Sequence, residues 1–221
     1  MSNPTQLDVA RLAGVSRGLV SLALSGSRRV SKETTAKILA AAEELGYVRD
    51  IGAASLAAGS SPLVGVLFSE LHNTFMEDVT EAIQARASAS SLLALLTTGG
   101  HHREREQLIM QRFRELRVAG VIMLSPAVSR KTLREYAEHV PLVTITLAQL
   151  GGLVDSVHVD EQAAGTLVAN RVTELGVPKL IHLAVSTFGG QDQTVIARRK
   201  AVERAAKVAG LEFATVGSVP E

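Results

Sequence analysis

Hydrophobic positions follow two different periods along this chain, and the change comes near residue 61. Before it, apolar residues recur at helical spacing, which predicts two short helices between residues 7 and 24 and a third over residues 31–45. Beyond it, continuous apolar runs alternate with segments whose apolar residues again lie three or four positions apart. Strands buried on both faces of a parallel sheet have this unbroken apolar character, so the second part predicts an α/β fold.

The first two helices are expected to meet at a tight turn. Ala10 is small enough for a second helix to cross close by, Gly14 suits a turn with positive φ, and Ser16 can cap the second helix. Val15 and Val20 would fill the space between the helices. An ordinary helical hairpin has the same spacing, but this order of residues is also that of a helix-turn-helix unit, whose second helix enters the DNA major groove.

The third helix favours the helix-turn-helix interpretation. It is predicted to start at Ser31 and to stop at Gly46. Its inward face is predicted to consist of Ile38, Leu39, Ala42 and Leu45. Thr5 and Asp8 form a start like a capping box for the first helix. Three short helices within the first 50 residues are typical of a DNA-binding headpiece.

Beyond residue 61, strands are predicted at 63–68, 92–97, 118–124 and 142–146, separated by helices at 74–88, 104–116 and 130–139. The inward residues of the first two of these helices are expected to be Phe75, Val79, Ala82, Ile83, Leu108, Ile109, Phe113 and Leu116. A second run is predicted to start with a strand at 157–159. It continues with helices at 161–175 and 194–209 and strands at 180–185 and 213–216.

Composition narrows the class of protein. The chain has 221 residues, enough for two units, and it has neither Cys nor Trp. A disulfide framework and a cysteine metal site are therefore excluded, and no cofactor is expected. The sequence shows no signal peptide and no long uncharged apolar run, which favours a cytoplasmic protein that does not enter a membrane.

Charge indicates how the chain would hold a nucleic acid. Residues 1–61 contain seven Arg and Lys against five Asp and Glu, a net charge of +2, which leaves −1 for the remainder of a chain whose net charge is +1. Phosphate contacts supply much of DNA affinity, and so mildly basic a headpiece would make few of them. We therefore expect a homodimer on a palindromic site.

Several short motifs in residues 7–47 resemble one known family. They are Asp8-Val9-Ala10, Ala13-Gly14-Val15-Ser16, Val20-Ser21, Arg29-Val30-Ser31 and Ala41-Ala42-Glu43-Glu44-Leu45-Gly46-Tyr47. Together they resemble the headpiece of the lactose-repressor/galactose-repressor (LacI/GalR) family of transcriptional regulators, and the resemblance covers essentially the whole chain. It implies an N-terminal all-α helix-turn-helix headpiece and an α/β parallel-sheet core with two lobes, like a periplasmic binding protein.

The expected divisions are a headpiece over residues 1–49, a hinge helix or linker over 50–61, a first lobe over 62–158 and the start of a second lobe over 159–221. Two or three strands with two helices would leave much apolar edge exposed. We therefore expect the second lobe to be incomplete and the chain to be a C-terminally truncated member of the family.

The resemblance places the DNA contacts on and around the second helix. Arg17 and Ser21 are expected to read base edges, with a solvated surface role as the alternative for Arg17. Gly18 and Leu22 depart from the family, in which base-reading side chains are common at both positions and the second is usually Arg. Leu22 could contact a thymine methyl group instead. The full expected set is Thr5, Ser16, Arg17, Gly18, Ser21, Leu22, Arg29, Ser31 and Leu56, with Ser16 on a phosphate.

Residues 50–58 resemble the hinge helix of the family. So short a helix is unstable alone, since about 12–15 residues are needed in water, and it is expected to fold only on DNA in a dimer. Leu56 matches the residue that wedges into the minor groove. Gly52, Ala54 and Ala57 favour the alternative, a linker without fixed structure.

The resemblance also implies a small-molecule effector, such as a sugar, at the carboxyl ends of the strands. The expected contacts are Ser69, Asn73, Phe75, Ser125, Thr146, Asp160 and Arg198. Arg198 aligns with an arginine that holds effector hydroxyl or carboxylate groups, or else lies on a solvated helix face. Phe75 is either a stacking or a core aromatic, and N-capping is the safer role for Asp160. Thr146 and Leu147 replace an Asp-Arg pair frequent in sugar-responsive members.

Three classes of function remain. A dimeric, effector-modulated transcriptional regulator, most often a repressor, is favoured. A stand-alone small-molecule-binding protein and a small α/β enzyme are the alternatives. No Ser/His/Asp or paired-carboxylate arrangement supports catalysis, so we expect no enzyme. His101 and His102 are adjacent but have no third ligand at useful spacing, which favours a loop over a metal site.

Overall fold

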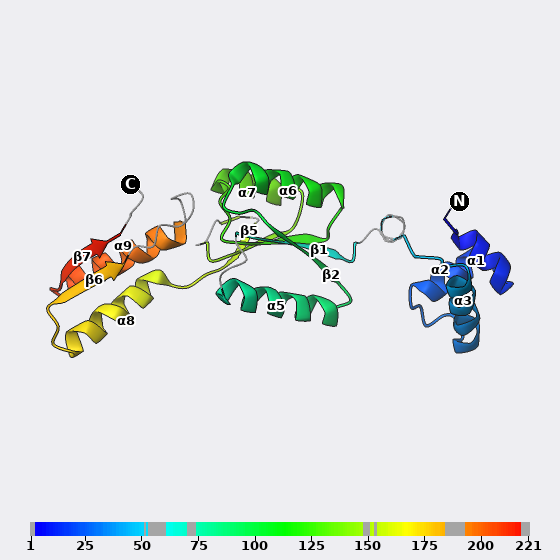
Figure 1. Ribbon diagram of the computed structural model, residues 1–221, viewed down its shortest axis with the longest axis horizontal. Helices are drawn as coiled ribbons and strands as arrows, with labels where there is room; N and C mark the ends of the chain where they lie inside the picture. Colours follow the sequence, from blue (N-terminus) through cyan, green and yellow to red (C-terminus); the bar gives the residue numbers. More distant parts are fainter. Residues whose placement is uncertain are drawn as a thin grey trace. The chain divides into compact units, whose positions relative to one another are not determined.

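The computed structural model describes residues 3–50, 52, 61–69, 74–147, 151–152, 154–183 and 193–217. The chain divides into two compact units, residues 1–59 and 60–221. Among the described residues, the first unit is all helical and the second alternates strands with helices (Figure 1). Within this part of the chain, no helix is both long and apolar enough to pass through a bilayer.

The first unit packs α1 (Gln6–Ala13), α2 (Arg17–Leu24) and α3 (Lys32–Glu44) around one small core. Its buried residues are Val9, Ala10, Val20, Ala23, Val30, Ile38, Ala41 and Ala42. Gly14 has a φ of 66°, which confirms that the turn after α1 uses the left-handed conformation. The prediction for Leu39 was wrong, because that side chain is 51% exposed and Ala41 occupies the inward position.

Each headpiece helix begins at a hydroxyl side chain. The hydroxyl oxygen of Ser16 accepts a hydrogen bond of 3.2 Å from the amide of Leu19, and that of Ser31 accepts one of 3.1 Å from Thr34. Thr5 and Asp8 form the reciprocal capping box at the start of α1. These caps satisfy amides that have no partner within the helix, which confirms the expected roles of Thr5 and Ser16.

The larger sheet of the second unit is parallel and has the order β2-β1-β3-β4-β5. Its strands are β1 (Leu63–Phe68), β2 (Leu93–Thr98), β3 (Gly120–Leu124), β4 (Leu142–Ile145) and β5 (Val154–Val157). Helix α5 (Thr74–Ala89) covers one face, while α6 (Arg103–Glu115) and α7 (Arg130–Ala137) cover the other (Figure 1). This arrangement confirms the α/β parallel-sheet expectation.

Strand β1 shows how the two faces are filled. Val66 and Phe68 pack with Met76 of α5, whereas Leu67 packs with Phe113 of α6 on the opposite face. Gly65 lets α6 sit this close, because a Cβ atom there would lie 2.6 Å from the Phe113 ring. Both faces of β1 are thus covered by helices, as expected for a central parallel strand.

The smaller sheet pairs β6 (Lys179–Leu183) with β7 (Glu212–Val216) in parallel. It is accompanied by α8 (Glu161–Glu174) and α9 (Gln193–Val208), which pack against each other. A Cβ atom at Gly165 would lie 2.8 Å from the backbone of Ala201, so this glycine sets the distance between the helices.

Three sequence predictions about these elements need correction. The strand expected at 157–159 is β5 at Val154–Val157, and it completes the first sheet by pairing with β4 instead of opening the second run. On α5, Met76 and Ala87 are buried, whereas Phe75 is 49% exposed and Ala82 is also exposed. On α6, Leu108 and Leu116 are exposed, and Glu106 and Met110 take the inward positions. A charged residue was not expected in that face.

Candidate functional site

The expected DNA-binding residues share one property, which is exposure. All eight that lie among the described residues are exposed, namely Thr5, Ser16, Arg17, Gly18, Ser21, Leu22, Arg29 and Ser31. Leu56 lies outside the described residues. The structure therefore leaves the whole described set accessible to a large partner.

Three members of that set, Thr5, Ser16 and Ser31, are also the N-caps of the three helices. The positive end of a helix dipole and its free amides favour a nearby phosphate. At α1 the position is already held by a carboxylate, since Asp8 Oδ2 accepts from the Thr5 hydroxyl at 2.7 Å and from the Thr5 amide at 2.9 Å. These hydrogen bonds lower the pKa of Asp8 below its ordinary value of 3.8.

The exposed face of α2 is mixed in character. Arg17 supplies its only positive charge, Gly18 has no side chain, Ser21 is short, and Leu22 presents an apolar side chain that is 38% exposed. At the end of the helix, the Ser25 hydroxyl donates a hydrogen bond of 2.9 Å to the carbonyl of Leu22. The face combines one cation, one hydroxyl and one apolar group.

In the core, the structure brings two of the expected effector residues together. Ser125 follows β3 and Thr146 follows β4, and their hydroxyl oxygens lie 2.7 Å apart. Both residues are non-glycine residues with positive φ, 49° and 74°. Such backbone conformations are costly for residues with a Cβ atom and concentrate at functional sites. Both side chains are half-buried at the edge where open parallel sheets bind ligands.

Thr146 also connects to the smaller sheet's helices. The Thr194 hydroxyl, in the first turn of α9, donates a hydrogen bond of 3.0 Å to the carbonyl of Thr146. A ligand that displaced or strengthened this contact would act on both lobes.

Side chains of α6 form hydrogen bonds with the backbone of the loop that carries Ser125. One carboxylate oxygen of Glu106 accepts hydrogen bonds from the amides of Ala127, at 2.8 Å, and Val128, at 3.0 Å. The Arg103 side chain donates a hydrogen bond of 3.0 Å to the carbonyl of Ala127. Burial raises the pKa of Glu106 above its ordinary value of 4.5, although these two amides and the charge of His101 oppose the shift.

The remaining expected effector residues are more dispersed. Ser69 is buried, and its carbonyl accepts from the Thr98 hydroxyl at 3.1 Å and the Gly100 amide at 2.9 Å. Asp160 caps α8, because its carboxylate accepts a hydrogen bond of 3.0 Å from the Ala163 amide. This confirms the N-capping role expected for it. Arg198 forms two hydrogen bonds of 2.9 and 2.8 Å with the Glu161 carboxylate. Asn73 lies outside the described residues.

Sequence reasoning missed Glu106, Thr194 and Arg199. The Nε atom of Arg199 is buried and has no hydrogen-bond partner among the described residues, while its Nη1 lies 3.1 Å from Glu203. Arg199 is thus a second candidate beside Arg198 for holding a polar ligand. The sequence feature that could have indicated Arg199 is its place next to Arg198. Adjacent positions of a helix point in different directions, so the two arginines have different surroundings.

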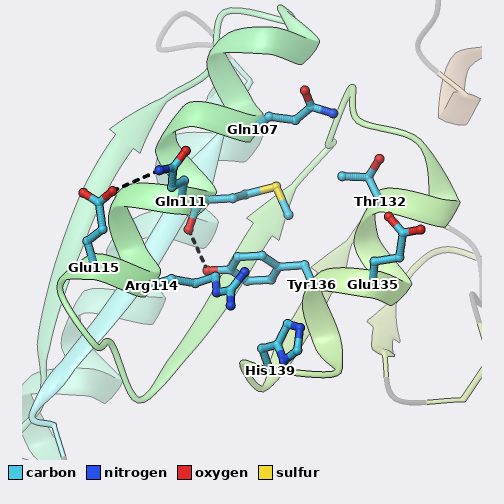
Figure 2. Close-up of a pocket in the computed structure, with 9 residues that line it drawn as sticks. Gln107, Gln111, Arg114, Glu115, Thr132, Glu135, Tyr136 and His139 are labelled. Carbon is cyan, nitrogen blue, oxygen red and sulfur yellow. Dashed lines mark hydrogen bonds between the residues drawn. The ribbon is translucent and has the colours of Figure 1, made fainter.

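A hollow between α6 and α7 contains none of the expected site residues. Figure 2 shows the residues that line it, with Gln107, Gln111, Arg114 and Glu115 on α6 and Thr132, Glu135, Tyr136 and His139 on or just after α7; the Glu115 carboxylate lies beside Gln111. At its floor, the Tyr136 hydroxyl donates a hydrogen bond of 3.0 Å to the Met110 carbonyl. Burial raises the pKa of Tyr136 to about 12.

No metal centre emerges from the described residues, in which no group of three or more His, Asp or Glu side chains is arranged to hold an ion. His101 has a φ of 60° and precedes α6. The two adjacent histidines therefore lie where the chain enters a helix.

Two family models match the sequence. Residues 5–50 match the bacterial regulatory proteins of the lacI family, and residues 61–217 match the periplasmic binding proteins and sugar binding domain of the LacI family. The chain belongs to the LacI family. This assignment agrees with the helix-turn-helix unit and with the parallel sheet described above.

Among relatives of this LacI-family chain, the maltose regulon regulatory protein MalI of Escherichia coli K12 is 34% identical over 193 residues, which cover 85% of this chain and 54% of that protein. The ribose operon repressor of the same organism is 30% identical over 218 residues, which cover 95% of this chain and 63% of that protein. The LacI-family chain therefore spans a little over half the length of these relatives.

Solved structures show the same fold. A LacI-family transcriptional regulator from Silicibacter pomeroyi matches with a TM-score of 0.77 and 26% identity, over 97% of this chain and 66% of that one. The Lac repressor dimer bound to operator and the anti-inducer ONPF matches with a TM-score of 0.78 and 21% identity, over 98% and 66%. At 21% identity, the Lac repressor match supports only the fold of the LacI-family chain, not its function.

Proposed function

We propose that this LacI-family chain is a sequence-specific DNA-binding transcriptional regulator, a repressor that acts as a homodimer on a palindromic operator. The headpiece carries the proposal. Helix α2 is capped, rests on a compact core, and exposes Arg17, Ser21 and Leu22 on one face. A helix held in this way fits the major groove, where base edges present groups that such side chains contact.

We further propose that a small polar molecule, of which a sugar is the leading class, binds at the carboxyl ends of β3 and β4. The paired hydroxyls of Ser125 and Thr146 support this site, because two strained, half-buried polar residues lie where open parallel sheets bind ligands. The matched CelR structure, at 25% identity and a TM-score of 0.56, is a complex with cellobiose.

The proposed regulation is a shift between two states of the core. An effector changes DNA affinity only if it binds those states with different affinity. The hydrogen bond from Thr194 to the Thr146 carbonyl is a candidate for the contact that differs, since it links the strand ends to α9. The proposed hinge residues, including Leu56, would transmit the change to paired headpieces.

The test is selection of the full chain against a randomised DNA duplex pool at moderate salt, with its oligomeric state measured by sedimentation. An enriched palindrome bound by a dimer is the expected result. A folded chain that enriches no sequence would overturn the proposal.

A second arm measures effector response. Maltose, ribose and cellobiose are titrated into the chain alone and into its complex with the enriched duplex. A sugar that changes DNA affinity supports the regulator, and Ser125→Ala should weaken its effect. A sugar that binds without changing DNA affinity would favour the stand-alone binding protein.

A further inference from the structure

The hollow between α6 and α7 lies between two helices that run in the same direction. Each helix leads from the end of one strand of the larger, parallel sheet back to the start of the next, and both cover the same face. Positions four and seven apart on a helix lie on one side of it. The hollow has a volume of about 710 Å³. The residues so spaced along its two walls are Gln107, Gln111, Arg114, Thr132, Tyr136 and His139.

The two ends of the hollow differ in chemistry. Figure 2 shows Gln107 and Thr132 toward one end and Arg114 and His139 toward the other. The amide and hydroxyl of the first pair are uncharged and can both donate and accept hydrogen bonds. The guanidinium group of Arg114 is always charged and can donate two parallel hydrogen bonds to one anionic group. One end thus suits an uncharged polar group, and the other suits an anion.

The carboxylates beside the hollow have cations of their own. Glu115 accepts a hydrogen bond of 2.7 Å from Arg112, which lowers the pKa of Glu115 below its ordinary value. Glu135 lies 3.7 Å from Lys131. Arg114, in contrast, forms neither an ion pair nor a side-chain hydrogen bond within the described part of the chain. Its charge is therefore available to a ligand.

The floor between the two ends is apolar. Met110 is 2% exposed and Tyr136 is 7% exposed, and the Tyr136 hydroxyl already donates to the Met110 carbonyl. The positive charge of Arg114 opposes the rise in the pKa of Tyr136, so the guanidinium group lies near this floor. Arg114 follows Gln107 by seven positions, about 10 Å along the helix axis. A ligand that fills the hollow is therefore elongated and has an apolar face between its two polar ends.

We propose that this hollow binds a nucleoside monophosphate. The phosphate group lies at Arg114 and His139, and the flat face of the base covers the apolar floor. The polar edge of the base points toward Gln107, whose amide can donate to and accept from one base edge. A sugar phosphate supplies the anion but no flat ring, and a nucleoside supplies the ring but no anion. The site lies within one lobe, and it does not depend on the proposed binding of DNA.

Calorimetric titration of the full chain at fixed ionic strength tests the proposal. The probes are AMP, GMP, CMP and UMP, each compared with its own nucleoside and with ribose 5-phosphate. At least one nucleotide should bind about tenfold more tightly than either of its fragments, because hydrogen bonds between charged groups add to the contact of the base. If no nucleotide binds more tightly than both fragments, the proposal is overturned.

Arg114→Gln tests the phosphate end. Arg114 is exposed, so the variant should unfold at the wild-type urea concentration. It should lower nucleotide affinity about tenfold and leave nucleoside affinity unchanged. The matched control is Arg105→Gln, which removes an exposed arginine of the same helix that does not line the hollow. This control should retain full nucleotide affinity. Equal losses in the two variants would show a general effect of charge and overturn the site.

Gln107→Ala tests the end that contacts the base. It should lower the affinities for the nucleotide and its nucleoside alike, by about fivefold, and leave that for ribose 5-phosphate unchanged. Methyl resonances of ¹³C-labelled methionine then locate the ligand. The nucleotide should shift the resonance of Met110 but not that of Met76, which packs on the opposite face of the sheet. A shift of Met76 without a shift of Met110 would place the nucleotide elsewhere and overturn the proposal.

Discussion

Glu106 holds the loop that carries Ser125, and it does so through a single carboxylate oxygen that accepts both amides. A glutamine has one carbonyl oxygen that can accept both, so Glu106→Gln should unfold at nearly the wild-type urea concentration. Glu106→Leu removes the acceptor of the Ala127 and Val128 amides and should lose about 2–4 kcal/mol of unfolding free energy. Equal unfolding free energies for the two variants would show that these hydrogen bonds contribute nothing.

The same residue predicts a pH dependence. The raised pKa means that the folded state binds a proton more tightly than the unfolded chain does, so Glu106 favours folding at low pH. That contribution should be fully present below the ordinary value of 4.5 and should be lost as pH rises through the raised pKa. Wild-type stability relative to Glu106→Gln should therefore fall as pH rises. A difference that is constant across this window would contradict the shift.

At the scale of elements, Ser16 has two roles that can be separated. Ser16→Ala removes the cap of α2 and should cost about 1 kcal/mol. Ser16→Asp keeps a capping oxygen and should retain the stability measured by thermal unfolding. Its negative charge should nevertheless weaken DNA binding if Ser16 faces a phosphate. Unchanged DNA affinity in Ser16→Asp would place the phosphate contact elsewhere.

Two helical glycines should respond oppositely to one substitution. Gly18→Ala adds a methyl group that would have only the Ser16 hydroxyl nearby, at 4.0 Å, and should stabilise the chain. Gly165→Ala adds one 2.8 Å from the backbone of Ala201, which cannot rotate aside, and should cost about 1–2 kcal/mol after the gain in helix propensity. Urea unfolding of both variants tests the pair. Stabilisation by Gly165→Ala would mean that α8 and α9 do not pack this closely.

At the scale of the whole chain, one face of the smaller sheet is apolar and uncovered in the described structure. Ile181 and Leu183 of β6 are 54% and 72% exposed, and in register they pair with Ala214 and Val216 of β7. Exposed apolar faces of this kind promote association. The double variant Ile181→Lys/Leu183→Lys should lower concentration-dependent association in sedimentation velocity while leaving the unfolding midpoint nearly unchanged. Unaltered association would assign the contact to another surface.

Local patterns located most elements within a few residues. The caps at Thr5 and Ser16, the left-handed turn at Gly14 and the central strands were all predictable, because each depends on neighbours in the sequence or on unbroken apolar runs. Errors arose where burial depends on distant neighbours. Leu39 and Leu108 have the right character and period for inward positions, but the packed face lies slightly further around each helix.

The sequence by itself determined the headpiece, the α/β class and the family, since capping, turn conformation and strand character are local properties that short motifs record. Only the tertiary structure decided that β5 completes the first sheet, that Glu106 is buried beneath the loop after β3, and that Ser125 meets Thr146. Those facts depend on strand order and on crossover packing, which bring together residues some 20 positions apart. The same holds for Gly18, whose lack of structural need appears only when the space around it is known.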